Sequence, residues 1–170
     1  MKKFLAILFL TFPLLAGAQQ WSPASADDAA AVLAKVDAVV SNVGTLSCNF
    51  VQTKHTAMLE EDLVSKGRMS VEAPATLVWE YTSPSQKSYT TNLNDNRRYQ
   101  AMARKKDFSR EVFSGAKEWK IVLTPLKRDL KQLFAGIEVW MDKASGEFTR
   151  VVMTDPNGDT TKIEFSNVKR

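Results

Sequence analysis

The sequence predicts a mainly β protein of the α+β class, in which an antiparallel sheet is rolled around a pocket and covered by helices. Two observations carry this prediction. From residue 46 onward, apolar and polar side chains alternate in several short segments separated by Gly, Pro, Asn and Asp. Helical spacing occurs in only two places, near residues 25–43 and 126–134. The same pattern also fits a sheet packed solidly on its helices, with no pocket.

The N-terminus has the three parts of a secretory signal peptide. Lys2 and Lys3 precede an apolar run over residues 4–15, and small residues end the segment at Ala18. The apolar run is too short to span a bilayer. We therefore expect residues 1–18 to be removed, and residues 19–170 to form one domain outside the cytoplasm.

One long amphipathic helix is expected at the start of this domain. Ser25 and Asp28 have the spacing of a helix N-cap, and Gly44 is a suitable stop. The apolar positions between them recur at helical spacing and are Ala29, Val32, Leu33, Val36, Val39, Val40 and Val43. A shorter helix is expected where Leu126, Leu130, Leu133 and Phe134 return to that spacing before Gly136.

A meander of strands fills the rest of the chain. The expected strands begin at residue 46 and continue over residues 63–71, 77–81, 88–93, 119–123, 136–142, 148–154 and 161–168. Ser145-Gly146 and the segment 155–159 are turn sequences between the last three. Leu46, Cys48 and Phe50 share one strand face, and so do Gly67, Met69 and Val71.

The distribution of charge narrows the classes of possible binding partner. The formal charge of +4 includes Lys2 and Lys3, so the remainder carries 4 − 2 = +2. The excess gathers in one segment that contains Arg97, Arg98, Arg104, Lys105, Lys106 and Arg110. This segment is either a docking patch for an acidic protein or anionic headgroups, or a solvated surface. Nucleic acid is a poor candidate partner for an exported protein without interleaved surface aromatics.

Cys48 is the only cysteine, so no internal disulfide can form and a hydrophobic core must stabilise the fold. We expect Cys48 to be buried, since a free cysteine behaves as a small hydrophobe.

The residues that an enzyme or a metal site needs are not found in a recognised pattern. His55 is the only histidine, and no Gly-x-Ser-x-Gly motif occurs. Asp155, Asn157 and Asp159 alternate like the start of a calcium loop, but no Glu stands at the closing position. We therefore expect neither catalysis nor a bound metal or cofactor.

The candidate site is the apolar concave face of the sheet. Leu77, Trp79 and Tyr81 are three large apolar groups on one face of one strand, between Pro74 and Pro84. We predict that the cavity is lined by Phe50, Met69, Val71, Leu77, Trp79, Tyr81, Ile121 and Leu123. We predict that its lid is formed by Leu33, Val36, Val40, Leu130 and Phe134. The alternative is that these side chains form a solid core.

The chain resembles the LolA family of periplasmic carriers of outer-membrane lipoproteins, in particular its short relatives in the Bacteroides group. The resemblance starts with Leu46-Ser-Cys-Asn-Phe-Val-Gln-Thr-Lys54 and continues from Gly67 through Trp79-Glu-Tyr-Thr-Ser-Pro84. Residues 119–125, 130–134 and 158–167 follow in the family's order. The resemblance implies an incomplete antiparallel β-barrel with a helical lid that binds lipoprotein acyl chains. It also implies an inner-membrane transporter that delivers the cargo and an outer-membrane acceptor that takes it.

Two departures from the family pattern bear on the lid. Ala73 stands where well-studied members have an Arg that helps to latch the lid, and the stretch between Leu93 and Phe113 is shorter than in those members. Two other functions therefore stay open. The chain could bind another lipid or hydrophobic metabolite in the same fold, or act as an assembly or adhesion factor without a cavity. In each case we expect a monomer.

Overall fold

The computed structural model describes residues 20–41, 45–72, 76–92 and 105–170. Its elements are β1 (Ser22–Pro23), α1 (Ala26–Ser41), β2 (Leu46–His55), β3 (Leu63–Glu72), β4 (Thr76–Ser83), β5 (Lys87–Asn92), the 3-10 turn Lys105–Asp107, β6 (Phe108–Ser114), β7 (Glu118–Pro125), α3 (Arg128–Lys131), β8 (Gly136–Asp142), β9 (Phe148–Thr154) and β10 (Thr160–Lys169). Within these ranges, no helix is both long and apolar enough to cross a membrane.

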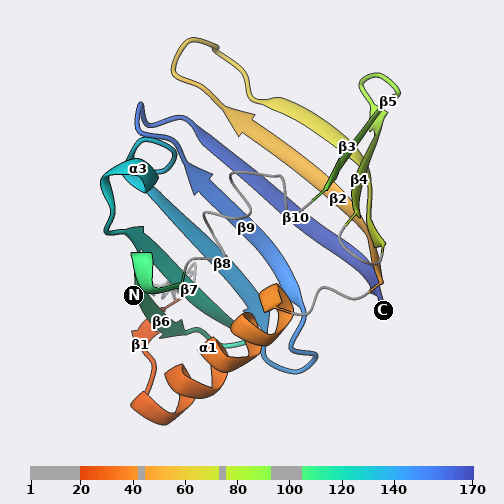
Figure 1. Cartoon of the computed structure of the whole chain (residues 1–170). Coiled ribbons are helices and arrows are strands. Elements are labelled where there is room, and N and C mark those ends of the chain that lie inside the picture. The colour runs from red at the N-terminus through yellow and green to blue at the C-terminus, as the bar shows by residue number, and fades with distance from the viewer. Residues whose placement is uncertain (1–19, 42–44, 73–75, 93–104) are drawn as a thin grey trace, which may run out of the picture.

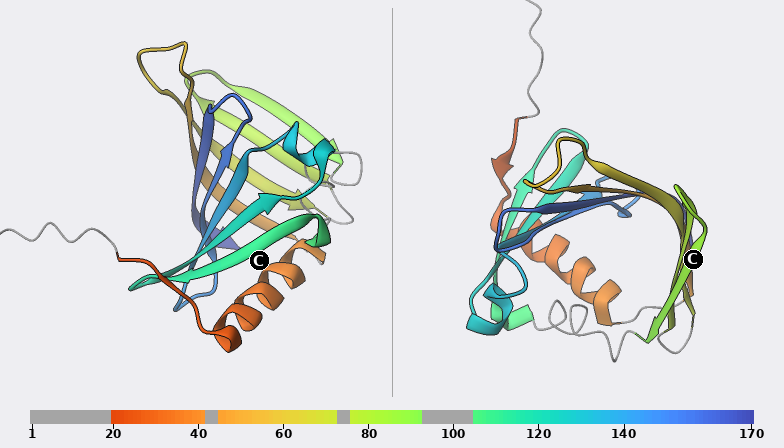
Figure 2. Two further views of the ribbon diagram at one scale, coloured as in Figure 1. Left: turned by 90° about the vertical axis from the view of Figure 1, so that its left-hand side faces the viewer. Right: turned by 90° about the horizontal axis from the view of Figure 1, so that it is seen from above.

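The strands form one antiparallel sheet of ten strands in the order β1-β6-β7-β8-β9-β10-β2-β3-β4-β5. The sheet curves strongly, so that β3–β5 stand opposite β6–β8 (Figures 1 and 2). We call the concave side of this curved sheet the trough. β1 and β5 are the two edges of the sheet, and the barrel stays open. The expected half-barrel is therefore confirmed.

Helix α1 begins where the N-cap pattern predicts. The Ser25 hydroxyl donates to Oδ2 of Asp28 at 2.8 Å, and the Asp28 amide donates back to the Ser25 oxygen at 3.2 Å. Asp27 and Asp28 also place negative charge at the positive end of the helix dipole. Val32 is buried and Leu33 and Val36 pack on the core, so the apolar stripe faces the sheet. The predicted stop at Gly44 lies outside the described residues.

Strand register places the apolar positions of successive strands on a single concave face. Across β6 to β10 the aligned residues are Val112, Ile121, Val139, Val151 and Ile163. A second aligned row starts two residues further along β10 and runs from Phe165 through Phe50 and Gly67 to Tyr81. The same face thus continues from β6 to β5.

The core is concentrated under α1 and α3, which lie beside β6 and β7. Its buried members are Val32, Phe108, Val112, Ile121, Leu123, Leu130, Phe134, Ile137, Val139 and Met141. Figure 2 shows α1 on the concave side of the sheet, against the wall that contains β6–β8. We call this region, β6–β9 with α1 and α3, the packed half, and β2–β5 the open half.

Three elements differ from the prediction. The two-residue strand β1, Ser22–Pro23, was not predicted. The second helix has only four residues, Arg128–Lys131. Strand β6 was not predicted, because Arg110 interrupts its alternation at a position that faces the concave side beside Leu123. Arg110 is accommodated there because Asp37 of α1 pairs with it. The expected burial of Cys48 is confirmed.

Candidate functional site

A cavity of about 260 Å³ lies between the C-terminal part of α1 and the concave face of the sheet. It is lined by Val39, Thr45, Leu46, Cys48, Met69, Glu147, Phe148, Phe165, Val168 and Arg170. The lining is mostly apolar, with its polar groups near the C-terminal end of β10 and the start of β9. The cavity therefore joins the packed half to the open half.

Strand alternation explains why this end of the trough is apolar. Leu46 and Cys48 occupy inward positions of β2, and Met69 of β3 lies directly opposite Cys48. Burial raises the pKa of the Cys48 thiol to about 11, so the group is uncharged at neutral pH. An uncharged thiol and a thioether behave as soft apolar surface.

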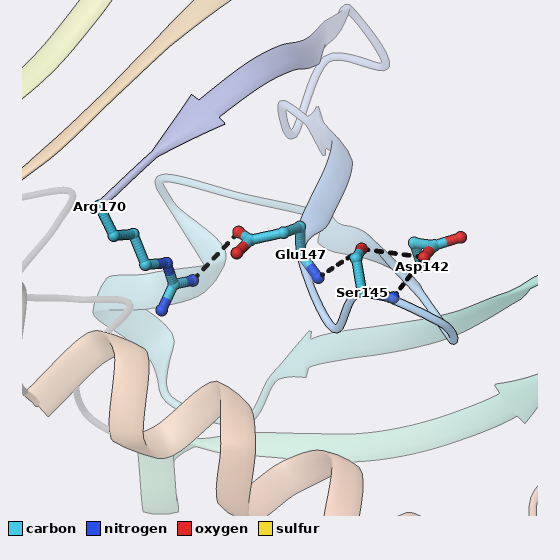
Figure 3. Close-up of polar contacts among 4 residues, drawn as sticks. All are labelled: Asp142, Ser145, Glu147 and Arg170. Atoms are coloured by element: carbon cyan, nitrogen blue, oxygen red, sulfur yellow. Dashed lines mark hydrogen bonds and ion pairs between the residues drawn. The ribbon is translucent and has the colours of Figure 1, made fainter.

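An ion pair stands at the border of the cavity. Arg170 lies 3.2 Å from Glu147 at the end of the β8–β9 turn (Figure 3). This turn is held by Asp142, whose Oδ1 accepts from the Ser145 amide at 2.7 Å and from the Ser145 hydroxyl at 2.9 Å. These bonds lower the pKa of Asp142, so the turn is stabilised by the ionised carboxylate. Polar groups thus mark the side where the cavity meets solvent.

An aromatic cluster forms the floor and wall of the open half. The Phe50 ring meets Trp79 edge to face at 4.7 Å and Tyr81 at 5.2 Å, between ring centroids. Gly67 on the intervening strand makes this possible, because an added Cβ there would come within 2.8 Å of the Phe50 ring. Tyr81 in turn meets Tyr89 of β5 at 5.8 Å. The apolar surface therefore continues from the cavity toward the sheet edge.

The trough becomes polar beyond this cluster. A second pocket of about 320 Å³ is lined by Gln52, Ser65, Tyr81, Ser83, Pro84, Ser85, Lys87 and Tyr89. The Tyr81 hydroxyl donates to Oε1 of Gln52 at 3.1 Å. Burial raises the pKa of Tyr81, which keeps this hydroxyl protonated as a donor. The apolar region is thus limited at one end by polar hydrogen-bonding groups.

The helix is fastened to the sheet by the Arg110–Asp37 ion pair. Nη1 of Arg110 lies 2.8 Å from Oδ1 of Asp37, and the two side chains are 27% and 26% exposed. The pair ties the middle of α1 to β6. The family latch position, Ala73, lies outside the described residues.

The predicted lining residues fall into three groups. Met69 lines the cavity, and Phe50 and Val71 are buried next to it. Half-buried positions on the wall of the open half are occupied by Leu77, Trp79 and Tyr81. Ile121 and Leu123 lie in the core of the packed half, so we leave them out of the proposed site.

The predicted lid and docking residues are also placed only in part. Leu33 and Val36 lie on α1 against the core, whereas Leu130 and Phe134 are fully buried in it. Lys106 is exposed. The side chains of Val40, Arg97, Arg98, Arg104 and Lys105 lie outside the described part of the chain.

Sequence reasoning missed several lining residues on strands that it did predict. Leu46, Phe148, Phe165 and Val168 come from β2, β9 and β10, whose inward positions were visible as apolar alternation. Their meeting depends on the pairing of β10 with β2, which joins the end of the chain to its first long strand. No local pattern in the sequence indicates that pairing.

The fold and the cavity define an open antiparallel half-barrel with one helix over an apolar recess. The sequence model of the outer membrane lipoprotein carrier protein LolA matches residues 41–95, a range that includes β2, β3, β4 and β5. Over this range the chain is similar to the LolA family. No curated protein matches its sequence.

Solved structures with similar folds are distant in sequence. A complex of MucA and MucB from Pseudomonas aeruginosa matches with a TM-score of 0.51 and 11% identity, over 84% of this chain and 56% of that one. A LolA superfamily protein from Nitrosomonas europaea matches with a TM-score of 0.41 and 10% identity, over 83% of this chain and 92% of that one. An uncharacterised conserved protein from Thermus thermophilus matches with a TM-score of 0.46 and 18% identity, covering 84% and 87% of the two chains.

Proposed function

We propose that this protein carries lipoproteins through the periplasm by sheltering their acyl chains in the trough. The observation that carries the proposal is the apolar cavity between α1 and the sheet, which is continuous with the aromatic wall formed by Trp79 and Tyr81. The match to the LolA family model over residues 41–95 supports the same interpretation. On this view the protein is a binding protein and not an enzyme.

The size of the cavity sets how the cargo is held. Ligand pockets usually measure about 300–1,000 Å³, and the cavity of about 260 Å³ falls just below that range. It accepts part of one acyl chain with α1 in the position seen here. Further chains need either the open half or a displacement of α1.

Loose binding suits a carrier. Burial of a methylene contributes roughly 0.8 kcal/mol, so complete burial of about forty methylenes from three chains would contribute about 30 kcal/mol. Measured affinities stop near 20 kcal/mol, and a cargo held so tightly could not be released. A trough that shields the chains partly allows both capture and release.

We propose that α1 is the movable part of the site. Its apolar stripe rests on the packed half, while Val39 near its C-terminal end lines the cavity. The Arg110–Asp37 pair is the polar contact that would have to yield if the helix moved. In this chain the pair would serve as the latch that family members build around an Arg at the position of Ala73.

The proposed route is the one that the similarity to the LolA family implies. A signal peptide over residues 1–18 would export the chain to the periplasm. There it would receive acylated proteins from an inner-membrane transporter and deliver them to an outer-membrane acceptor.

A second candidate is a carrier for another lipid or hydrophobic metabolite. The small cavity favours it, since about 260 Å³ is closer to the needs of one apolar chain than of three. Native mass spectrometry of protein isolated from its own periplasm separates the two candidates. An acylated polypeptide supports the first and a free lipid supports the second.

A matched pair of variants on β4 tests the trough itself. Leu77 faces the trough beside Val71, whereas its neighbour Val78 faces the opposite side beside Ser70. We expect Leu77→Glu to weaken binding of a triacylated lipopeptide about tenfold or more, because a carboxylate in the apolar surface must be desolvated. Val78→Glu should bind like the unmodified protein. Equal binding by both variants would contradict the proposal.

A further inference from the structure

The loop between β2 and β3 exposes apolar side chains far from the trough floor. Met58 is 95% exposed, Leu63 52%, Val64 48% and Leu59 45%. We call residues 56–64 the β2–β3 tip. Figure 1 shows it extending beyond the rest of the sheet, at the end away from the C-terminus. Clusters of exposed apolar side chains on a monomer usually mark an interaction site.

The β2–β3 tip is held in place by hydrogen bonds. The Ala57 amide donates to Oδ1 of Asp159 at 3.2 Å, which fastens the tip to the β9–β10 turn. Within the tip, the Leu59 amide donates to the Thr56 carbonyl at 3.1 Å. At its base, His55 and Asp62 lie 2.8 Å apart. Met58 and Leu59 are therefore presented on a built turn, which lowers the entropy lost on binding.

The charge of the β2–β3 tip is opposite to that of the chain. The whole chain carries a formal charge of +4. Residues 55–65 contain Glu60, Glu61 and Asp62 and no Lys or Arg, which makes their formal charge −3 with His55 neutral. Asp62 faces His55, whereas Glu60 and Glu61 directly follow the apolar pair and favour a partner surface that supplies positive charge.

A lipid surface does not fit this composition. Anionic headgroups attract basic segments and repel carboxylates, and Glu60 and Glu61 directly follow Met58 and Leu59. A protein surface with an apolar pocket and a rim of Lys or Arg fits both features of the tip.

The same end of the sheet also offers a shallow recess. A groove of about 410 Å³ is lined by Thr124, Pro125, Leu126, Lys131, Phe134, Ala135 and Pro156. Pro156 belongs to the β9–β10 turn, the turn whose Asp159 holds the tip. Leu126 at this groove is 54% exposed. The apolar surface thus continues from the tip across the turn.

We propose that the β2–β3 tip is a docking element that inserts Met58 and Leu59 into an apolar pocket, rimmed by basic residues, on a partner protein. That this partner is membrane-associated rests on the proposed carrier function. The proposal does not depend on the cargo, because the tip lies outside the cavity. It goes beyond the proposed carrier function by naming the surface that meets the partner and the chemistry of that partner.

Two double variants separate the apolar and the charged contribution. Met58→Ser with Leu59→Ser removes the inserted side chains, and Glu60→Lys with Glu61→Lys reverses the charge. Glu72→Lys with Glu111→Lys is the charge-matched control, because both residues are exposed, Glu72 lies at the far end of β3 from the tip and Glu111 lies on β6. All positions are exposed, so each variant should keep the fold, which circular dichroism and the melting temperature verify.

The binding assay uses membrane vesicles from the bacterium that produces the protein, the same vesicles after protease treatment, and liposomes of phosphatidylethanolamine and phosphatidylglycerol at 3:1. We expect binding to the untreated vesicles alone. The serine variant should lose about thirtyfold in affinity, as when a central interface anchor is truncated. The lysine variant should lose about tenfold at low salt and less at high salt.

A photo-crosslinking residue at position 58 then identifies the contact. The captured protein, purified and titrated with the three double variants, should reproduce their order of affinity. Cargo binding, measured with a triacylated lipopeptide, should be unchanged in all of them, so this test fails or succeeds separately from the carrier function.

Three outcomes would overturn the proposal. The tip variants could bind vesicles like the control, or the protein could bind protease-treated vesicles and liposomes equally well, which would indicate a lipid ligand. Alternatively, sedimentation could show self-association that Glu60→Lys with Glu61→Lys abolishes, which would identify a second copy as the occupant.

Discussion

The two halves of the concave face share a sequence pattern and differ in what covers them. In the packed half, Ile121 and Ile137 of the sheet are fully buried, as are Leu130 of α3 and Phe134 just after it. In the open half, Trp79 and Tyr81 are half-buried and Tyr89 is 55% exposed. Apolar alternation along a strand therefore reports which face is inward, whereas the position of the helix decides whether that face is core or binding surface.

This division gives each half its own task. The packed half supplies the hydrophobic core that a chain with a single cysteine needs for stability. The open half can expose apolar surface to a ligand because the other half maintains the fold. The cavity lies where they meet, with Val39 of α1 on one side and Cys48 and Met69 on the other.

The largest expected effect is a loss of stability when a core residue of the packed half is truncated. Phe134→Ala should lower the free energy of unfolding by about 3–5 kcal/mol, since it leaves a cavity in a fully buried site. Tyr89→Ala is the control in the open half, and at 55% exposure it should cost less than about 1 kcal/mol. Urea unfolding measures both. Similar losses would show that the two halves are packed alike.

The second effect concerns the aromatic floor of the open half. Gly67→Ala adds a Cβ that would overlap the Glu80 carbonyl oxygen and approach the Phe50 ring to 2.8 Å. We expect a loss of about 1–3 kcal/mol, as for overpacking elsewhere, together with weaker binding of an acylated peptide. Gly158→Ala is not a suitable control, because Gly158 has φ 90° and any other residue would be strained there.

Gly136→Ala is the better control, since an added Cβ there meets only the Leu123 carbonyl oxygen, at 3.8 Å. Unfolding and binding data that do not distinguish the two alanines would rule out this role of Gly67.

A smaller loss of stability is expected when the ion pair between α1 and β6 is removed. Arg110→Met leaves Asp37 without this partner, and we expect a cost of about 1–2 kcal/mol, because the pair is about a quarter exposed and partly screened. If the pair is the latch, the variant should also bind and release acylated peptide faster in stopped-flow fluorescence. Asp37→Leu in the same background should recover part of the stability while the exchange stays fast. Unchanged exchange rates in both variants would argue against a latch.

The smallest expected effect is the slow reaction of the Cys48 thiol with an alkylating reagent. Burial raises the pKa of the Cys48 thiol from 9.0 to about 11, so its thiolate at pH 8 should be roughly a hundredfold scarcer than that of an exposed cysteine. Iodoacetamide should modify it slowly at pH 8 and faster as the pH approaches 11. Because the folded state holds this proton more tightly, the thiol contributes a loss of stability as the pH rises from 9 to 11. Rapid modification at pH 8, with urea-unfolded protein as the reference, would show an accessible thiol.

Much of the fold could be predicted because local patterns determine it. The Ser25 cap, the alternation of β2 and β3, and the turn at residues 155–159 all have short-range signals that the structure confirms. Strand β6 escaped prediction because Arg110 occupies an inward position, and only its partner Asp37, 73 residues away, explains it.

The site was less accessible to sequence reasoning. Ile121 and Trp79 have the same local signature, an inward apolar residue flanked by one valine and one charged residue. They differ in the tertiary contact that each makes, since α1 and α3 pack over the core that contains Ile121, whereas Trp79 meets Phe50 of β2 within the open half. Phe148 and Phe165 were missed for a related reason, because the β10–β2 pairing that brings them to Cys48 links distant segments.

The central claim is that acyl chains occupy the space between α1 and the open half. A triacylated lipopeptide with a diazirine in its acyl chain, photolysed in complex with the protein and mapped by mass spectrometry, tests it most directly. We expect adducts on Leu46, Met69, Phe165 and Trp79, and none on Val78 or Val122, which face the other side of the sheet. Adducts confined to that outer side, or no adducts on the trough residues, would contradict the account.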